Sequence, residues 1–131
     1  MRPIADTGLL VGFLDQSDQY HEWAASCFDE LRTALTTCEA VIAETEYLVP
    51  GSGPLLMEMV RRGTLQIAPI LPKEAEVIAT VLKRYGKMQF ADACIVRMSE
   101  ILPDPVVYTT DKRDFSVYRR HRNQAIKLVT P

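Results

Sequence analysis

Short apolar segments alternate along this chain with longer segments in which apolar residues recur every three or four positions. The short segments predict β-strands at residues 2–5, 35–37, 64–68, 106–109 and 125–129. The longer ones predict helices at about 7–14, 19–33, 55–62, 72–85, 88–102 and 112–118, with a further helix that carries Glu44. Strands alternating with helices are typical of an α/β domain with a central parallel sheet of about five strands and helices on both faces.

Turn and capping residues mark where these elements begin and end. Thr36 and Glu39 have the spacing of a capping box, which predicts that they open the helix carrying Glu44. Residues 50–54 (PGSGP) end that helix, because proline and glycine are both poorly tolerated in a helix interior. Pro72 is expected at the first position of the next long helix.

Size and composition indicate one soluble domain that covers residues 1–131. The chain has 131 residues, of which 47% are hydrophobic and 24% charged, as in ordinary globular proteins. No apolar run approaches the ~20 residues that span a bilayer, so we expect no membrane association. Cys27, Cys38 and Cys94 are odd in number, widely spaced and set among apolar neighbours. We therefore expect buried free thiols and a cytoplasmic location, with no signal peptide.

Charge is unevenly distributed, although the formal net charge is only -2. Basic residues gather in the last twenty or so positions, where the candidates for binding a polyanion are Arg113, Arg119, Arg120 and Arg122. If the acids described next are neutralised by a metal ion, the remaining surface is net positive. A solvated basic tail is the alternative interpretation of the same arginines.

Four acidic residues stand in otherwise apolar surroundings. Asp6 and Asp111 each lie just past the carboxyl end of a predicted strand, whereas Glu44 and Asp92 share helix faces with apolar residues. A buried carboxylate is costly unless it is paired, protonated or bound to a cation. Strand ends of a parallel sheet meet at one rim, where ligands gather, so we expect the four acids to converge there.

Each acid also has a purely structural interpretation. Asp6 is placed to cap the following helix, and Asp111 to form an Asx turn before a short helix. Asp92 lies near the start of its helix, where an acid complements the macrodipole. Oxygen ligands without a histidine or cysteine cluster favour Mg²⁺ or Mn²⁺ over zinc, and such ions activate water for phosphodiester hydrolysis. Both interpretations stay open at this point.

Four segments of the chain resemble the acidic motifs of PIN-domain ribonucleases. They are residues 4–10 (IADTGLL), 41–44 (VIAE), 90–93 (FADA) and 108–115 (YTTDKRDF). The resemblance extends over essentially the whole chain, and the most similar group is the VapC-like toxins of bacterial toxin–antitoxin pairs. It implies a three-layer α/β/α fold and a Mg²⁺- or Mn²⁺-dependent endoribonuclease.

The resemblance also implies roles for individual residues. Its catalytic, metal-binding acids fall on Asp6, Glu44, Asp92 and Asp111. Asp114, Thr7 and Thr110 match auxiliary positions beside those acids. The partners it implies are an RNA substrate, a second copy of the chain in a homodimer, and an antitoxin that inserts an arginine or lysine near the acids.

Other functions and other residues complete the expectations. A non-catalytic module that binds a basic partner through the same acids is the main alternative, and a DNA nuclease is another. His21 and Trp23 are expected to be structural and His121 to lie on the surface. The segment around Leu55, Leu56, Met57 and Met59 is expected to contribute to a dimer face.

Overall fold

A five-stranded parallel sheet forms the centre of the computed structural model, which describes every residue from Met1 to Pro131. Its strand order is β3-β2-β1-β4-β7, and all four neighbouring pairs are parallel. The strands are β1 (Arg2–Ala5), β2 (Leu35–Thr37), β3 (Leu65–Ile67), β4 (Pro105–Tyr108) and β7 (Leu128–Val129). The expected parallel α/β architecture is confirmed.

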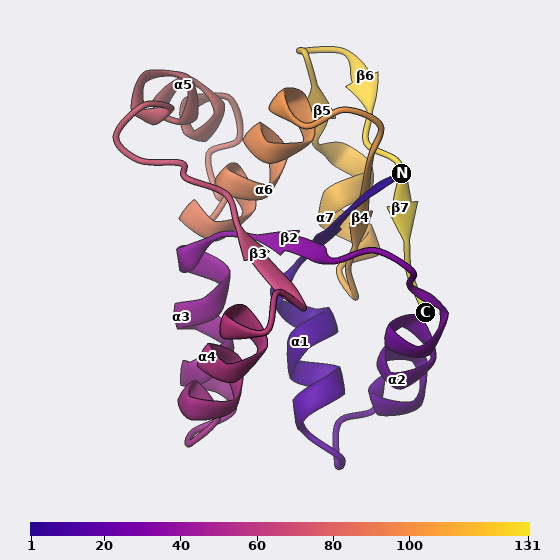
Figure 1. Cartoon of the computed structure of the whole chain (residues 1–131). Helices are drawn as coiled ribbons and strands as arrows, with labels where there is room; N and C mark the ends of the chain where they lie inside the picture. Colours follow the sequence, from indigo (N-terminus) through magenta and orange to yellow (C-terminus); the bar gives the residue numbers. More distant parts are fainter.

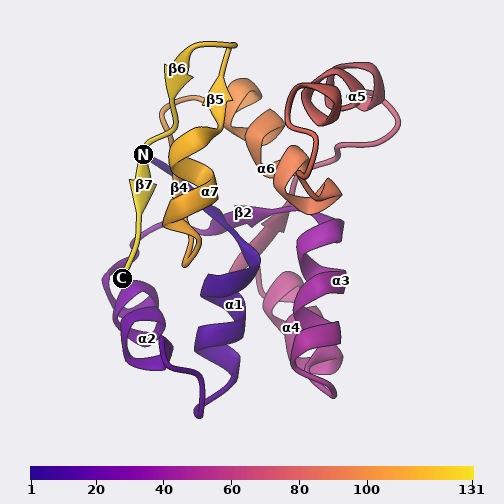
Figure 2. The same cartoon turned by 180° about the vertical axis from the view of Figure 1, so that it is seen from behind.

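Seven helices cover the two faces of this sheet. They are α1 (Thr7–Leu14), α2 (His21–Glu30), α3 (Glu39–Leu48), α4 (Gly53–Arg61), α5 (Ala75–Arg84), α6 (Phe90–Ile101) and α7 (Lys112–Val117). In Figure 1, α1 to α4 lie below the strands, and α5 and α6 lie above them. The view from behind in Figure 2 shows the same division, with α7 beside β4. This is a three-layer α/β/α arrangement.

The strand order changes direction at β1. From β1 the chain moves outward to β2 and β3, then returns to place β4 and β7 on the other side of β1. Loops leaving β1 and β4 therefore run to opposite faces and leave an opening between them. Ala5 is in register with Tyr108, so the residues that follow each strand begin side by side.

The core is continuous across the layers. Twenty-seven buried apolar residues form one cluster, which includes Ile4 of β1, Val107 of β4, Ile95 of α6 and Phe115 of α7. Cys27, Cys38 and Cys94 are buried free thiols, as predicted. None of the seven helices combines the length and the hydropathy of a membrane span.

Several predicted boundaries are wrong, and local hydrogen bonds explain them. The capping box is absent: Cys38 is the N-cap of α3, no side-chain cap bond forms, and Thr36 lies in β2. Helix α2 begins at His21 rather than residue 19, because the Tyr20 amide donates to the Asp18 carboxylate in a turn. Helix α5 begins at Ala75, after a turn that contains Pro72.

The predicted final strand at 125–129 is divided between two sheets. Gln124–Ala125 forms β6, which pairs antiparallel with β5 (Arg119–Arg120) in a separate hairpin. Only Leu128–Val129 joins the main sheet, beside β4. The continuous apolar pattern in the sequence contains no signal for this change of partner.

Candidate active site

The ends of β1 and β4 are tied together by the hydroxyl of Thr109. This hydroxyl donates to the carboxylate of Asp6 at 2.6 Å and accepts the backbone N–H of Asp111 at 2.9 Å. Asp6 is the N-cap residue of α1 but makes no side-chain cap bond. Its side chain is therefore directed to the strand-end rim, and the capping interpretation of Asp6 does not hold.

Helix α1 begins very close to the segment that follows β4, and this approach requires Gly8. A Cβ atom at Gly8 would lie 2.0 Å from the Thr110 Oγ1 atom, well inside any real contact. The neighbouring Thr7 is buried, and its hydroxyl has no hydrogen-bond partner. Thr7 and Thr110, both predicted as auxiliary residues, thus lie beside Asp6 at the start of α1.

Asp92 reaches the same region from the opposite layer. It lies in the first turn of α6, as the macrodipole interpretation expected, and its side chain is partly buried. One carboxylate oxygen accepts a hydrogen bond from the Tyr118 hydroxyl at 2.9 Å. The helix position and the convergence on the rim are therefore compatible.

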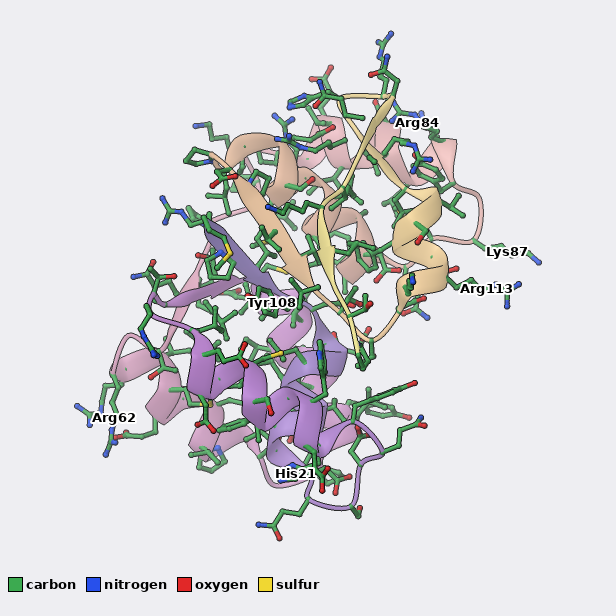
Figure 3. The ribbon with its side chains drawn as sticks, turned by 90° about the vertical axis from the view of Figure 1, so that its right-hand side faces the viewer. His21, Arg62, Arg84, Lys87, Tyr108 and Arg113 are labelled. Carbon is green, nitrogen blue, oxygen red and sulfur yellow. The ribbon has the colours of Figure 1, made fainter.

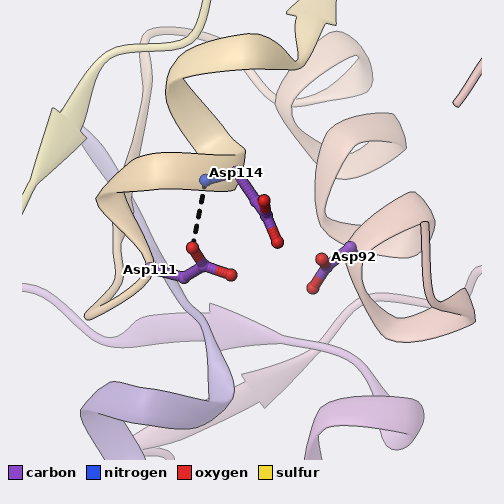
Figure 4. A group of neighbouring side chains, drawn as sticks. All are labelled: Asp92, Asp111 and Asp114. Atoms are coloured by element: carbon purple, nitrogen blue, oxygen red, sulfur yellow. Dashed lines mark hydrogen bonds between the residues drawn. The ribbon is translucent and has the colours of Figure 1, made fainter. Parts of the chain in front are cut away.

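Asp111 and Asp114 lie together at the start of α7. One oxygen of Asp111 accepts the Asp114 backbone N–H at 3.0 Å, which is the predicted capping turn. Figure 4 shows the carboxylates of Asp92, Asp111 and Asp114 directed toward one another. One oxygen from each lies within 4.8 Å of the others. The tightest group therefore contains Asp114, the predicted auxiliary acid, in place of Asp6 or Glu44.

These acids line a cleft of about 420 Å³, which we call the acidic cleft. Glu44 lines it from α3, together with Leu48 of the same helix. Its acidic residues are Asp6, Asp18, Glu44, Asp92, Asp111 and Asp114, and its other walls include Thr7, Thr110, Tyr20, Lys87, Gln89 and Tyr118. All four principal acids predicted from the sequence are thus in one cavity.

Burial and mutual repulsion perturb the acids of this cleft. Burial, with the nearby charges of Glu44 and Asp111, raises the pKa of Asp6 to about 6 despite the bond from Thr109. Burial and the charge of Asp6 raise the pKa of Asp92 to about 7, although the Tyr118 hydroxyl opposes this. The charge of Asp111 raises the pKa of Asp114. Protonation or a bound cation would relieve the repulsion among these acids.

The donor set of the acidic cleft fits a hard divalent cation. None of its acids forms an ion pair, since every salt bridge of the protein lies elsewhere. Converging carboxylate oxygens, with no sulfur or imidazole among the lining residues, are ligands of the kind that Mg²⁺ and Mn²⁺ prefer. The unpartnered Thr7 hydroxyl adds a further buried oxygen beside them.

The four arginines predicted to bind RNA differ in their surroundings. Arg119 donates to the backbone oxygens of Ser116 and Tyr118, and Arg120 donates twice to the backbone oxygen of Ser99. Arg122 is exposed in the turn between β5 and β6. Arg113 is exposed on α7 close enough to Asp114 to influence its charge. Of the four, Arg113 is the one beside the cleft acids.

The two histidines and Trp23 lie where the sequence predicted. The His21 Nδ1 atom is 2.7 Å from the backbone oxygen of Gly12, which joins α2 to α1. Trp23 is partly buried against the core, and His121 is exposed. None of the three lines the acidic cleft.

Sequence reasoning missed Thr109, Tyr118 and Lys87. The sequence pattern predicts Thr110 as an auxiliary hydroxyl, whereas the hydroxyl that contacts Asp6 belongs to Thr109. Tyr118 follows Asp114 by one helical turn, a spacing that carries no distinct signal by itself. Lys87 lies between two helices and reaches the cleft only through the fold.

Comparisons with known proteins agree with this geometry. The curated relative Ribonuclease VapC26 from Mycobacterium tuberculosis is 27% identical over 123 residues, which cover 88% of this chain and 91% of the relative. The crystal structure of Mycobacterium tuberculosis VapC20, described as a sarcin-ricin loop cleaving toxin, superposes with a TM-score of 0.64. That match covers 80% of this chain and 86% of VapC20 at 16% identity, so it concerns the fold. The PIN domain family model matches residues 4–120, and the chain therefore belongs to the PIN domain family.

Proposed function

We propose that this protein is a metal-dependent endoribonuclease that acts as the toxin of a VapBC-like toxin–antitoxin pair. The observation that carries the proposal is a cleft in which acids from the β1–α1 junction, α3, α6 and the start of α7 meet, and none of these acids forms an ion pair. Two relatives support RNA as the substrate, because VapC26 is a ribonuclease and VapC20 a toxin that cleaves the sarcin-ricin loop.

Asp92, Asp111 and Asp114 are our candidates for the principal metal ligands, with Asp6 and Glu44 completing the acidic set. Mg²⁺ or Mn²⁺ bound there would lower the pKa of water and neutralise charge on the phosphodiester. Asp6, Glu44, Asp92 and Asp111 are the catalytic acids in this proposal, and Asp114 moves from an auxiliary role into the ligand group. Thr7 and Thr110 keep their auxiliary roles beside Asp6.

Neighbouring side chains hold these acids in position. The Thr109 hydroxyl donates to one oxygen of Asp6 and accepts the backbone N–H of Asp111, so it holds these two residues in a fixed relative position. The Tyr118 hydroxyl holds one oxygen of Asp92. Such outer contacts orient ligands and set their basicity. They leave the other carboxylate oxygens free to face the cleft.

A basic margin beside the cleft is our candidate for the RNA backbone site. Figure 3 shows Arg84, Lys87 and Arg113 along one side of the molecule, whereas Arg62 lies at the opposite side. Lys87 also lines the cleft itself. Tyr20, on another part of the cleft wall, offers a ring on which a base can stack. Arg119 and Arg120, already bonded to backbone oxygens, are weaker candidates than Arg113.

Exposed apolar residues beside the cleft support a protein partner. Tyr47, Leu48, Leu55 and Met57 are all more than half exposed, and Leu48 also lines the cleft. An antitoxin segment with apolar side chains and one arginine or lysine matches this surface. Of the residues expected on a dimer face, only Leu55 and Met57 are exposed and remain candidates, because Leu56 and Met59 are buried in the core. The three free thiols suit the reducing cytoplasm.

Cleavage of matched polymers tests the proposal. Purified protein free of any antitoxin is incubated with an RNA pool and a DNA pool, with Mn²⁺ or Mg²⁺ and with EDTA. We expect RNA cleavage that EDTA abolishes and that Asp92→Asn lowers by more than about 100-fold, since losing even an outer-shell contact costs about 10–100-fold. Asp29→Asn, on exposed α2, is the matched control and should retain full activity.

Two other results would identify the competing functions. Cleavage of DNA as efficient as that of RNA would make the protein a DNA nuclease. No cleavage of either polymer, combined with tight binding of a basic peptide that Asp92→Asn weakens, would make the cleft a binding module.

A further inference from the structure

A second hollow lies directly beside the acidic cleft. This hollow, which we call the apolar pocket, has a volume of about 760 Å³, within the size range of small-molecule sites. It is formed by the start of α3, the segment that follows β3 and the start of α6. Figure 1 shows the starts of α3 and α6 close together. Glu44 and Gln89 line both hollows, so the apolar pocket and the acidic cleft adjoin.

The chemistry of the apolar pocket differs from that of the cleft. Ten of its fourteen lining residues are apolar, against four of sixteen in the acidic cleft. They include Phe90 and Leu71, which are 44% and 56% exposed. No lysine or arginine lines the pocket, so a phosphate group finds no cation to pair with there. The pocket therefore suits an uncharged group with a large apolar surface.

Three polar side chains line this pocket with unused hydrogen-bonding capacity. Gln89 is the N-cap residue of α6, but its side chain makes no cap bond. Glu39 and Glu44 form no ion pair. Ionised carboxylates only accept hydrogen bonds, so these two acids favour a ligand that presents N–H groups. A flat ring that carries an amino group matches both the apolar walls and the acceptors.

We infer that the apolar pocket holds one unpaired base of the RNA substrate, next to the phosphodiester that the acidic cleft cleaves. The base stacks on the ring of Phe90, and its amino group donates to Glu39 or Glu44. Adenine, cytosine and guanine carry an amino group and uracil does not, so the pocket disfavours uridine at this position. The inference rests on the proposed nuclease function, to which it adds a site for one base.

Helix α6 links the base site to the metal candidates. Phe90 lies two positions before Asp92, and both belong to the first turn of α6. Phe90 lines the apolar pocket but not the cleft, and Asp92 lines the cleft but not the pocket. One nucleotide can therefore place its phosphate beside Asp92 and its base against Phe90. Proteins commonly recognise single-stranded RNA in this manner, through unstacked bases that pack on aromatic side chains.

Binding of matched heptanucleotides tests the base site without any cleavage. Each is a run of uridines whose central position carries adenine, cytosine, guanine, uracil or no base. Fluorescence anisotropy in an Asp92→Asn background measures the affinity of each. We expect the amino-bearing bases to bind about 10-fold more tightly than uracil or the abasic position, as one base-specific contact predicts. Equal affinity for all of them, or tightest binding with uracil, would overturn the inference.

Substitutions locate the effect in the pocket. Phe90→Ala should weaken binding of the adenine oligonucleotide by about 10-fold, as the loss of one stacked base predicts, and should leave binding of the abasic one unchanged. Phe90→Leu, which keeps an apolar side chain without a ring, gives the same test if Phe90→Ala does not fold. Glu39→Gln should reduce the preference for adenine over uracil, because an amide can donate to a uracil carbonyl.

Ile101→Ala is the matched control, since Ile101 is 43% exposed at the far end of the same helix. It should keep the full preference among the heptanucleotides. A loss of affinity with Phe90→Ala that is equal for the adenine and abasic oligonucleotides would overturn the inference, because the ring would then not contact a base.

Cleavage separates this inference from the proposed function. Wild-type protein with Mn²⁺ should cut an RNA pool less often beside uridine than beside the other nucleotides. Cleavage beside all four alike would overturn the base site and leave the nuclease function standing. No cleavage at all would refute the nuclease function, and the heptanucleotides would still decide whether the pocket takes a base. Binding of an arginine–leucine peptide that Phe90→Ala weakens, with no difference among the oligonucleotides, would assign the pocket to a protein side chain instead.

Discussion

Two groups of buried acids in this protein are treated in opposite ways. Glu74 and Glu100 lie on either side of Arg97, whose guanidinium is 2.7 Å from one carboxylate and 3.1 Å from the other. Asp6 and Asp92 are also removed from solvent, but no arginine or lysine forms an ion pair with them. The first group is complete within the chain. In our proposal a metal ion completes the second.

The contrast separates acids that support the fold from acids that support function. Burial raises the pKa of Asp6 and Asp92 and leaves each carboxylate a net cost to the folded state at neutral pH. Strain of this kind is retained where a site needs it and is relieved by the ligand. Substitutions in the two groups should therefore change stability with opposite signs.

The largest effect is expected at Arg97. Arg97→Met leaves Glu74 and Glu100 buried without a cation, which should lower the free energy of unfolding by about 3 kcal/mol. The control is Arg62→Met, because Arg62 pairs with Glu58 on the exposed face of α4, where ion pairs contribute less than about 1 kcal/mol. Urea denaturation measures both. Equal losses in the two variants would erase the distinction between a buried and a surface ion pair.

Asp6→Asn should change stability in the other direction. The pKa of Asp6 is about 6 in the fold against an ordinary 3.8, so the folded state binds the proton more tightly. The free energy of unfolding of the wild type should then fall as pH rises from about 4 to 6 and stay low above that. Asn carries no such charge, so in EDTA the Asp6→Asn variant should be more stable than the wild type by up to about 3 kcal/mol at pH 8 and by little at pH 4.

Mn²⁺ provides the control for this experiment. A divalent ion replaces the missing positive charge, so it should stabilise the wild type at pH 8 more than at pH 5, and Asp6→Asn far less at either pH. Thermal unfolding with Mn²⁺ and with EDTA gives the stabilisation by Mn²⁺ for the wild type and for Asp6→Asn, each at pH 8 and at pH 5. A gain of Asp6→Asn over the wild type that is the same at pH 4 and pH 8 would mean that the carboxylate charge is not responsible.

Tyr118→Phe should lower the rate of RNA cleavage about 10-fold, as expected for the loss of an outer-shell contact. The lost hydroxyl bond to Asp92 normally lowers the pKa of that acid, so its loss raises the pKa further. The acid side of the pH–rate profile should consequently shift to higher pH. Tyr85→Phe is the matched control, since the Tyr85 hydroxyl accepts the Arg119 backbone N–H and touches no cleft acid. A lower rate with an unshifted profile would indicate a packing effect only.

The smallest effects are expected on the basic margin. Lys87→Gln and Arg113→Gln should each weaken RNA binding a few-fold and reduce the salt slope by about 1, because each removes one phosphate contact. Arg62→Gln, on the opposite side of the molecule, should leave both unchanged. Fluorescence anisotropy in an Asp92→Asn background avoids cleavage during the measurement. Equal weakening by all three substitutions would mean that binding depends on net charge alone.

Much of this arrangement could be predicted from the sequence, because it depends on local pattern. The bounds of β1, α1 and β2 follow from apolar runs and turn residues and match the predicted ranges. The principal acids stood out because carboxylates are unusual on apolar segments. The sequence pattern predicts only an auxiliary role for Asp114, since its chain position makes it a surface residue of a short helix. Only the meeting of α6 with α7 places its carboxylate among the metal candidates.

The sequence by itself determined which acids are out of place and which elements carry them, since hydrophobic periodicity and strand ends are properties of neighbouring residues. The tertiary structure alone decided which side chains complete the set. Thr109 bonds to Asp6, 103 positions away along the chain, and Tyr118 bonds to Asp92, 26 positions away. Such contacts arise when the sheet and both helical layers pack together, and no local pattern encodes them. The physical reason is that a hydrogen bond depends on distance in space, and distance along the chain does not fix it.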